Sequence, residues 1–249
     1  MLRYFIRISF LGNNYCGWQI QPGQISVQET IEKCISNLVK DKITIVGAGR
    51  TDSGVHAYKM IAHFDAKFHS NPNGDFVYKL NQFLPEDISV NSIRRVKDDA
   101  HARFDALSRT YEYFINTKKT PFGNEFHYNF DQSLDIKAMK EATKLLIQYD
   151  DFECFSKSRT DVKTFICNIS FADWTLIDNG YKFTITANRF LRNMVRAIVG
   201  TIIDIGLKKK FLDDLTKIIE SKDRSLAGFS VPAKGLFLTE IQYPKNIYL

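Results

Sequence analysis

Hydrophobic and polar positions alternate or recur at helical spacing along most of the first half of the chain. Residues 3–10 (RYFIRISF) place Tyr4, Ile6, Ile8 and Phe10 on one side, which predicts a strand. Apolar residues three and four apart predict a helix over residues 27–40, and Ser26 and Glu29 before it have capping-box spacing. The same criteria predict a helix near residues 76–83 and strands at residues 43–46, 60–65 and 88–96.

The second half repeats this mixture of elements. Helices are predicted near residues 136–146, 191–202 and 211–219, and strands at residues 107–116, 165–176, 181–187 and 235–242. The sequence Asp178-Asn179-Gly180 predicts a hairpin turn with positive φ angles. We therefore predict an α+β fold of two similar α/β-sandwich halves with mainly antiparallel sheets, residues 1–104 and 105–249, and an active-site cleft between them.

Composition narrows the class of protein. The chain has 249 residues, 44% of them hydrophobic and 25% charged, which is typical of a globular protein. Its net charge of +6 has the sign that a polyanionic partner requires, although a merely basic enzyme explains it equally well. Four cysteines without a C-x-x-C pair argue against a disulfide scaffold and a cysteine-rich zinc site. The longest apolar stretch is broken by Arg196 and Asp204, so we expect no membrane span and a cytoplasmic location.

A glycine-rich loop, GAGRTDSGVH, follows the predicted strand at residues 43–46. Its G-x-G start is similar to a dinucleotide-binding turn, but Asp52 occupies the third glycine position and would repel a pyrophosphate, so we reject a nucleotide cofactor. In an extended segment Arg50 and Asp52 project to the same side, where the guanidinium favours an ionised carboxylate able to act as nucleophile or general base. Spacing alone favours the alternative, in which Asp52 forms a turn and Arg50 is a surface charge.

Several motifs together point to one family. The segment GRTDSGVHA resembles the active-site motif of the TruA family of tRNA pseudouridine synthases. The segments YCGWQIQP, AHARFDALSRTYEYFI, DFECFSK, NRFLRNMVRAIVGTI and RSLAGFSVPAKGLFL resemble its other motifs in the same order, over nearly the whole chain. The resemblance implies a homodimeric enzyme that converts uridine to pseudouridine at positions 38, 39 and 40 of the tRNA anticodon stem–loop, without cofactor or metal. Ser53 stands where the family often has alanine, a difference that we expect to be tolerated.

The resemblance also implies catalytic roles. Asp52 is the expected nucleophile, attacking either C1′ of the ribose or the base. Arg50 is expected to help draw the target nucleotide out of the helix, and Tyr111 to stack on the extruded uracil and shuttle a proton. Arg196 is expected to pair with Asp52. From the residues alone, a pairing of Tyr111 with Tyr113 in a packed sheet is the better interpretation.

Further residues are candidates for substrate binding. Arg189 and Arg192 fall with Arg196 at i, i+3 and i+7, which predicts one stripe of a helix, and a solvated face is the alternative for the first two. By analogy Leu236 lines the uracil pocket, although an ordinary core leucine explains it too. His56 is a candidate RNA contact, with packing as the alternative that we favour.

Basic residues beside aromatic ones mark another candidate RNA surface. Lys157, Arg159 and Lys163 lie near Phe152 and Phe155 in the sequence. A non-catalytic RNA-binding protein of the same fold would keep such a surface. The joint presence of an acid, a tyrosine and two arginines distinguishes the enzyme from it, because binding a polyanion needs no carboxylate.

Overall fold

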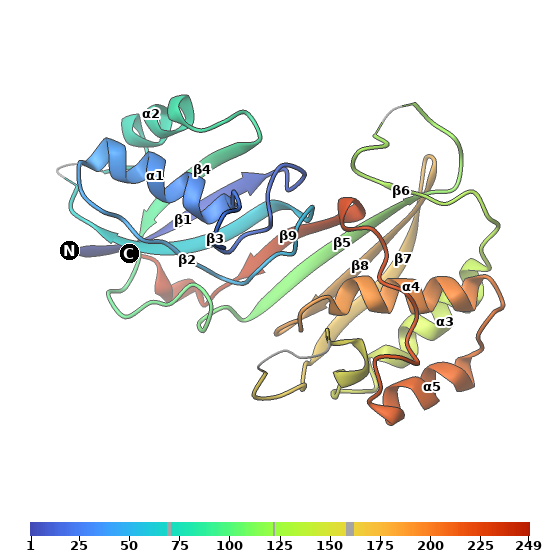
Figure 1. The fold of residues 1–249 in the computed structure, drawn as a ribbon. Coiled ribbons are helices and arrows are strands. Elements are labelled where there is room, and N and C mark those ends of the chain that lie inside the picture. The colour runs from blue at the N-terminus through green and yellow to red at the C-terminus, as the bar shows by residue number, and fades with distance from the viewer. Residues whose placement is uncertain (69–70, 122, 158–161) are drawn as a thin grey trace. The chain divides into compact units, whose positions relative to one another are not determined.

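The computed structural model describes residues 1–68, 71–121, 123–157 and 162–249, which form two compact units (Figure 1). Unit 1 comprises Met1–Ser108 and Leu238–Leu249, and unit 2 comprises Arg109–Phe237. The last segment of the chain, Leu238–Leu249, falls in the first unit, whereas the predicted second half runs over residues 105–249.

Unit 1 is a sheet with the strand order β4-β1-β3-β9, with β2 paired to the edge of β3. β1 runs antiparallel to both β3 and β4. The helices α1 and α2 lie over one face of this sheet (Figure 1). The elements are β1 (Leu2–Phe10), α1 (Val27–Val39), β2 (Val46–Gly47), β3 (His56–Ala66), α2 (Asp75–Phe83), β4 (Ile88–Arg95) and β9 (Leu236–Gln242), whose first two residues are counted with unit 2.

Local sequence explains the first helix. Ser26 is its N-cap, and its Oγ accepts a hydrogen bond from the Glu29 backbone N–H at 3.2 Å, as the capping pattern predicts. The predicted strand at residues 43–46 is wrong except at Val46, where β2 begins, because side chains of α1 take the backbone hydrogen bonds of the residues before it. The N–H of Ile43 donates to Ser36 Oγ and that of Ile45 to Glu32 Oε1, both at 2.9 Å.

Unit 2 contains a second sheet region with the order β5-β8-β7, in which neighbouring strands are antiparallel. The short strand β6 is parallel to β5. The α+β class with mainly antiparallel pairing is thus confirmed. The elements are β5 (Ser108–Asn116), β6 (Tyr128–Asn129), α3 (Ile136–Leu146), β7 (Ile169–Ile177), β8 (Gly180–Ala187), α4 (Met194–Gly206) and α5 (Leu212–Ser221).

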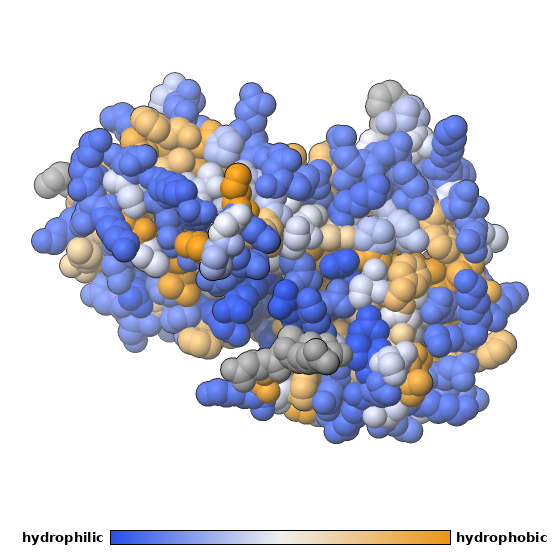
Figure 2. Space-filling model, viewed as in Figure 1, coloured by the Kyte–Doolittle hydropathy of each residue, from blue (hydrophilic) through white to orange (hydrophobic). Residues whose placement is uncertain are grey.

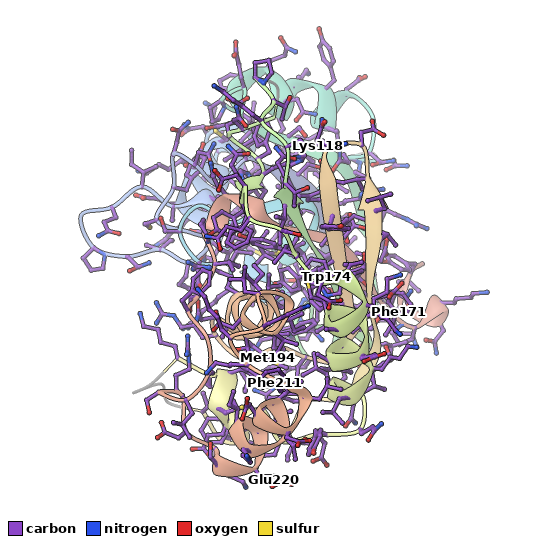
Figure 3. The ribbon with its side chains drawn as sticks, turned by 90° about the vertical axis from the view of Figure 1, so that its right-hand side faces the viewer. Lys118, Phe171, Trp174, Met194, Phe211 and Glu220 are labelled. Carbon is purple, nitrogen blue, oxygen red and sulfur yellow. The ribbon has the colours of Figure 1, made fainter. Side chains whose placement is uncertain are left out.

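The helices of unit 2 cover one face of its strands. Figure 3 shows Trp174 on the side of β7 that faces α3, and Phe171 on the other side. The indole Nε1–H of Trp174 donates to Thr143 Oγ1 of α3 at 3.1 Å, so the buried ring keeps a polar partner. Phe171 is about half exposed, which marks the face that the helices leave uncovered.

Two predictions for unit 2 need correction. The hairpin between β7 and β8 forms, but no residue of its turn has a positive φ. Gly180 is needed for a different reason, since a Cβ there would lie 2.0 Å from the carbonyl oxygen of Ile115 on β5. The predicted helix at residues 191–202 begins only at Met194, because Asn193 has a φ of +68° and breaks the helical path.

The surface is mostly polar. Hydrophilic residues cover most of the face seen in Figure 2, and apolar residues form small separate groups. Over the described ranges, no helix combines the length and the apolar character needed to cross a membrane.

Candidate active site

The loop of residues 47–56 joins β2 to β3 and carries the acidic candidate. Arg50 is exposed, Thr51 is buried and Asp52 is partly exposed, so burial alternates along these residues. This pattern matches an extended segment in which Arg50 and Asp52 share one side and Thr51 points to the core. The sequence-based prediction that these two charged residues project together is consistent with it.

A tight turn follows Asp52. Its backbone carbonyl accepts a hydrogen bond from the Val55 N–H at 3.2 Å, and Gly54 has a φ of +79°. A positive φ at the third residue of a four-residue turn is the mark of type II geometry, which favours glycine there. The backbone of Asp52 closes this turn, and the turn fixes the direction in which the chain leaves the residue.

A second segment, residues 12–17, packs against the backbone of this loop, and we call it the glycine clamp. Gly17 forms an isolated antiparallel bridge with Asp52, and Ser53 Oγ donates to the carbonyl of Tyr15 at 3.1 Å. The approach is too close for side chains, because a Cβ at Gly12 would lie 2.1 Å from the Val55 carbonyl oxygen. The clamp therefore depends on glycine and holds Asp52 at a defined backbone position.

His56 belongs to this clamp. Its side chain is fully buried, and its Nδ1 accepts a hydrogen bond from the Gly12 N–H at 3.1 Å. Burial and this bond favour the packing role over direct contact with RNA.

In unit 2, β5 carries both tyrosines considered above. Tyr111 is partly exposed and meets Phe190 edge to face, with the ring centroids 5.2 Å apart. Tyr113 is fully buried, burial raises the pKa of its phenol, and its hydroxyl donates to the Pro232 carbonyl at 2.8 Å. The two tyrosines share one strand and pair with Ile185 and Phe183 of β8, so they form no cross-strand pair with each other.

Arg196 lies in the first turn of α4 and is partly exposed. Its Nε donates to the carbonyl of Val231 at 2.7 Å, and the Val231 N–H donates to the Arg196 carbonyl at 3.3 Å. This reciprocal pair ties the guanidinium to the segment of residues 228–231.

The predicted arginine stripe does not exist as a helix face. Arg189 and Arg192 lie before α4, in the loop that Asn193 ends. Arg189 Nη1 donates to the Thr164 carbonyl at 3.1 Å, and the Arg192 carbonyl accepts from the Lys157 N–H at 3.0 Å.

The two loops that carry Lys157 and Arg192 are therefore joined through their backbones, and both side chains are exposed. Lys163 is exposed as well, while Arg159 lies outside the described residues.

Leu236 opens β9 directly after the short 3-10 turn Ala233–Gly235 and is buried. Its burial fits both the core interpretation and a place in the wall of a pocket. Within the described parts of the chain, no group of three or more His, Cys, Asp or Glu side chains is placed to hold a metal ion.

The candidates thus fall into two sets. Arg50, Asp52 and His56 belong to one loop of unit 1, and unit 2 holds Lys157, Arg189, Arg192, Arg196, Tyr111 and Leu236. Sequence reasoning missed the glycine clamp and the contacts of residues 228–231. The two glycines of GNNYCG and the glycine of LAGFS were the available signal.

Comparison with known proteins decides the family. The family model described as tRNA pseudouridine synthase matches residues 6–105 and 142–244, which include both sets of candidates except Tyr111. The chain belongs to this family. The resemblance to TruA proteins predicted from the motifs is confirmed.

Relatives in this pseudouridine synthase family match along the full length. The chain is 51% identical to tRNA pseudouridine synthase A of Parabacteroides distasonis, covering 100% of this chain and 98% of that protein. It is 49% identical to the enzyme of the same name from Bacteroides thetaiotaomicron, covering 100% and 93%. Identity to that of Bacillus subtilis is 40%, over 97% of this chain and 99% of the relative.

Proposed function

We propose that this protein isomerises uridine to pseudouridine at positions 38, 39 and 40 in the anticodon stem–loop of tRNA. The reaction breaks the bond from N1 of uracil to C1′ and forms a bond from C5 to C1′. The C5 hydrogen leaves as a proton, and N1 takes up a proton. Electrons balance without an external donor or acceptor. The observation that carries the proposal is the fixed backbone position of Asp52 in a chain that matches the family over its length.

Asp52 is the proposed nucleophile. Effective nucleophilic attack needs a reacting group that is held in place before substrate arrives. The bridge to Gly17 and the turn closed by Val55 hold the backbone of Asp52, from which the carboxylate projects, through backbone contacts.

Three other residues complete the proposed catalytic group. The exposed Arg50 lies two residues before Asp52. It is suited to bind the phosphate of an extruded nucleotide or to fill the gap that this nucleotide leaves in the RNA helix. Tyr111 offers a partly exposed ring for stacking on uracil. Arg196 supplies positive charge for the reacting carboxylate.

The tRNA body needs a wider basic surface. We propose that Lys157 and Arg192, joined through their backbones, contact phosphates, together with Arg189. We further propose a cytoplasmic homodimer, in which two chains of net charge +6 share the polyanion.

The test is tritium release from an unmodified tRNA transcript labelled at C5 of uracil. Wild type and the Asp99→Asn control, which changes an exposed carboxylate of unit 1, should release tritium, and Asp52→Asn should not. Release by Asp52→Asn would remove this residue from its role. No release by wild type, together with salt-sensitive tRNA binding, would favour a non-catalytic RNA-binding protein instead. Transcripts lacking uridine at 38, 39 and 40 should give no release.

A further inference from the structure

In unit 2, residues 228–231 lie directly against the backbone of α4. A Cβ at Gly200 would lie 1.8 Å from the Phe229 carbonyl oxygen, and one at Gly228 would lie 2.6 Å from the Thr201 backbone nitrogen. The Gly228 N–H also donates to Thr201 Oγ1 at 2.8 Å. Contact at this range leaves the segment no room to slide toward the helix.

Val231, the last residue of this segment, determines the orientation of the Arg196 guanidinium. The Arg196 Nε donates to the Val231 carbonyl at 2.7 Å. A guanidinium is planar, and its N–H groups point in fixed directions. Since Nε is committed to Val231, a carboxylate can engage this side chain only through Nη1 and Nη2. The position of one backbone carbonyl therefore sets the direction of that pair of donors.

The Ser230 hydroxyl fixes the segment from the side. It accepts hydrogen bonds from Asn193 Nδ2 at 2.6 Å and from Arg224 Nη2 at 2.9 Å. Both partners are donors, so the two bonds use both acceptor sites of the hydroxyl. Arg224 Nη1 also donates to the Gly228 carbonyl at 3.1 Å, and Asn193 is the left-handed residue that precedes α4.

We propose that Ser230 and Arg224 are positioning residues for Arg196. Through Ser230, the start of α4 and the guanidinium of Arg224 hold the Val231 carbonyl where it orients Arg196 toward the reacting carboxylate. This inference rests on the proposed catalytic role of Arg196. Neither Ser230 nor Arg224 needs to contact the RNA for this role.

The experiment compares Ser230→Ala with Ser225→Ala, an exposed serine three residues before this segment, in the wild-type and Arg196→Ala backgrounds. Single-turnover tritium release at saturating tRNA is measured with tRNA affinity and Tm. A misplacement of about 1 Å can cost on the order of 100-fold in rate, so we expect Ser230→Ala to slow release by about 10- to 100-fold. Affinity for tRNA should stay unchanged, and Ser225→Ala should match wild type.

The second background separates positioning from general damage. Residues that act through one group are non-additive, so Ser230→Ala should slow the Arg196→Ala enzyme no further. Arg224→Ala should behave in the same way, while Arg224→Lys should lose most of the rate because a single ammonium cannot reproduce the fork to Ser230 and Gly228.

Equal rate losses in both backgrounds, or equal losses of rate and tRNA affinity, would overturn the inference. A wild-type rate for Ser230→Ala would do the same. Two reference proteins, wild type and Arg196→Ala, distinguish these results from failure of the proposed function. That failure would appear as no tritium release by wild type or as full release by Arg196→Ala.

Discussion

Gly17 and Asp52 meet as an isolated antiparallel bridge in which Gly17 has a φ of +107°, and a Cβ at Gly17 would lie 2.4 Å from the carbonyl oxygen of Thr51. The location of the candidate nucleophile thus depends on a residue far from it in sequence that has no side chain. Both the dihedral angle and the close approach exclude any other residue type at this position.

Replacement of this glycine should displace the loop. Gly17→Ala adds strain at a positive φ, of the order of 1 kcal/mol, and a contact with backbone that cannot move aside. We expect tritium release to fall by about 100-fold, with a lower Tm.

Gly23→Ala is the matched control, because Gly23 has a φ of +72° but nothing lies within 4 Å of its Cβ position. Gly23→Ala should lose stability through the strain of the positive φ, as Gly17→Ala does, but without a backbone contact, and it should keep its activity. Equal activity losses for the two variants would show that the clamp does not position Asp52.

Tyr111 is predicted to act through its ring. Stacking of a base on an aromatic side chain contributes about 1–3 kcal/mol, so Tyr111→Ala should lower kcat/KM by roughly 10- to 100-fold from stacking alone. Tyr111→Phe keeps the ring and its edge-to-face contact with Phe190, and it should retain the stacking contribution to kcat/KM. A rate for Tyr111→Phe as low as that for Tyr111→Ala would assign the effect to the phenol hydroxyl and to proton transfer.

The stability of unit 1 should depend on pH through His63. Burial is the main cause that lowers the pKa of this imidazole to about 4; His101 and Arg3 contribute to the lowering, and Asp65 and Asp105 oppose it. The unfolded chain binds this proton near pH 6.5 and the folded chain only near pH 4, so stability is complete above pH 6.5 and falls as the pH drops through this window. The loss reaches the order of 3 kcal/mol.

His63→Asn isolates this contribution. The imidazole Nδ1 accepts a hydrogen bond from the Ala102 N–H at 3.1 Å, and the asparagine Oδ1 can accept in its place without titrating. Denaturant unfolding at pH 7 and pH 5 should show a smaller loss of stability on acidification for the variant than for wild type. The same loss in both proteins would contradict the assignment to His63.

Local patterns predicted the elements whose causes are local. The alternation of β1 and the Ser26 cap of α1 depend on neighbours in sequence, and both are found as predicted. The error at residues 43–46 arose because Ser36 and Glu32 compete with strand pairing for the backbone, which period-two alternation does not report.

The candidate site divides in the same way. The motif around Asp52 can be recognised from the sequence, since its residues are consecutive. Its clamp and the contacts of Ser230 could not be predicted, because they join segments separated by tens of residues and act through backbone atoms common to all residues. The predicted arginine stripe was wrong because of Asn193. The apolar spacing of the sequence continues on both sides of this residue, but its left-handed backbone keeps the residues before it out of α4.

Unit 1 is assembled from both ends of the chain described here, and β9 takes its place beside β3. During synthesis on the ribosome, all of unit 2 is therefore made before unit 1 receives this strand. Until then β2 pairs with only a short part of this edge of β3, and the remainder is a site for wrong strand pairing. The unit that holds Asp52 thus receives its last strand only after the whole of the other unit has been synthesised.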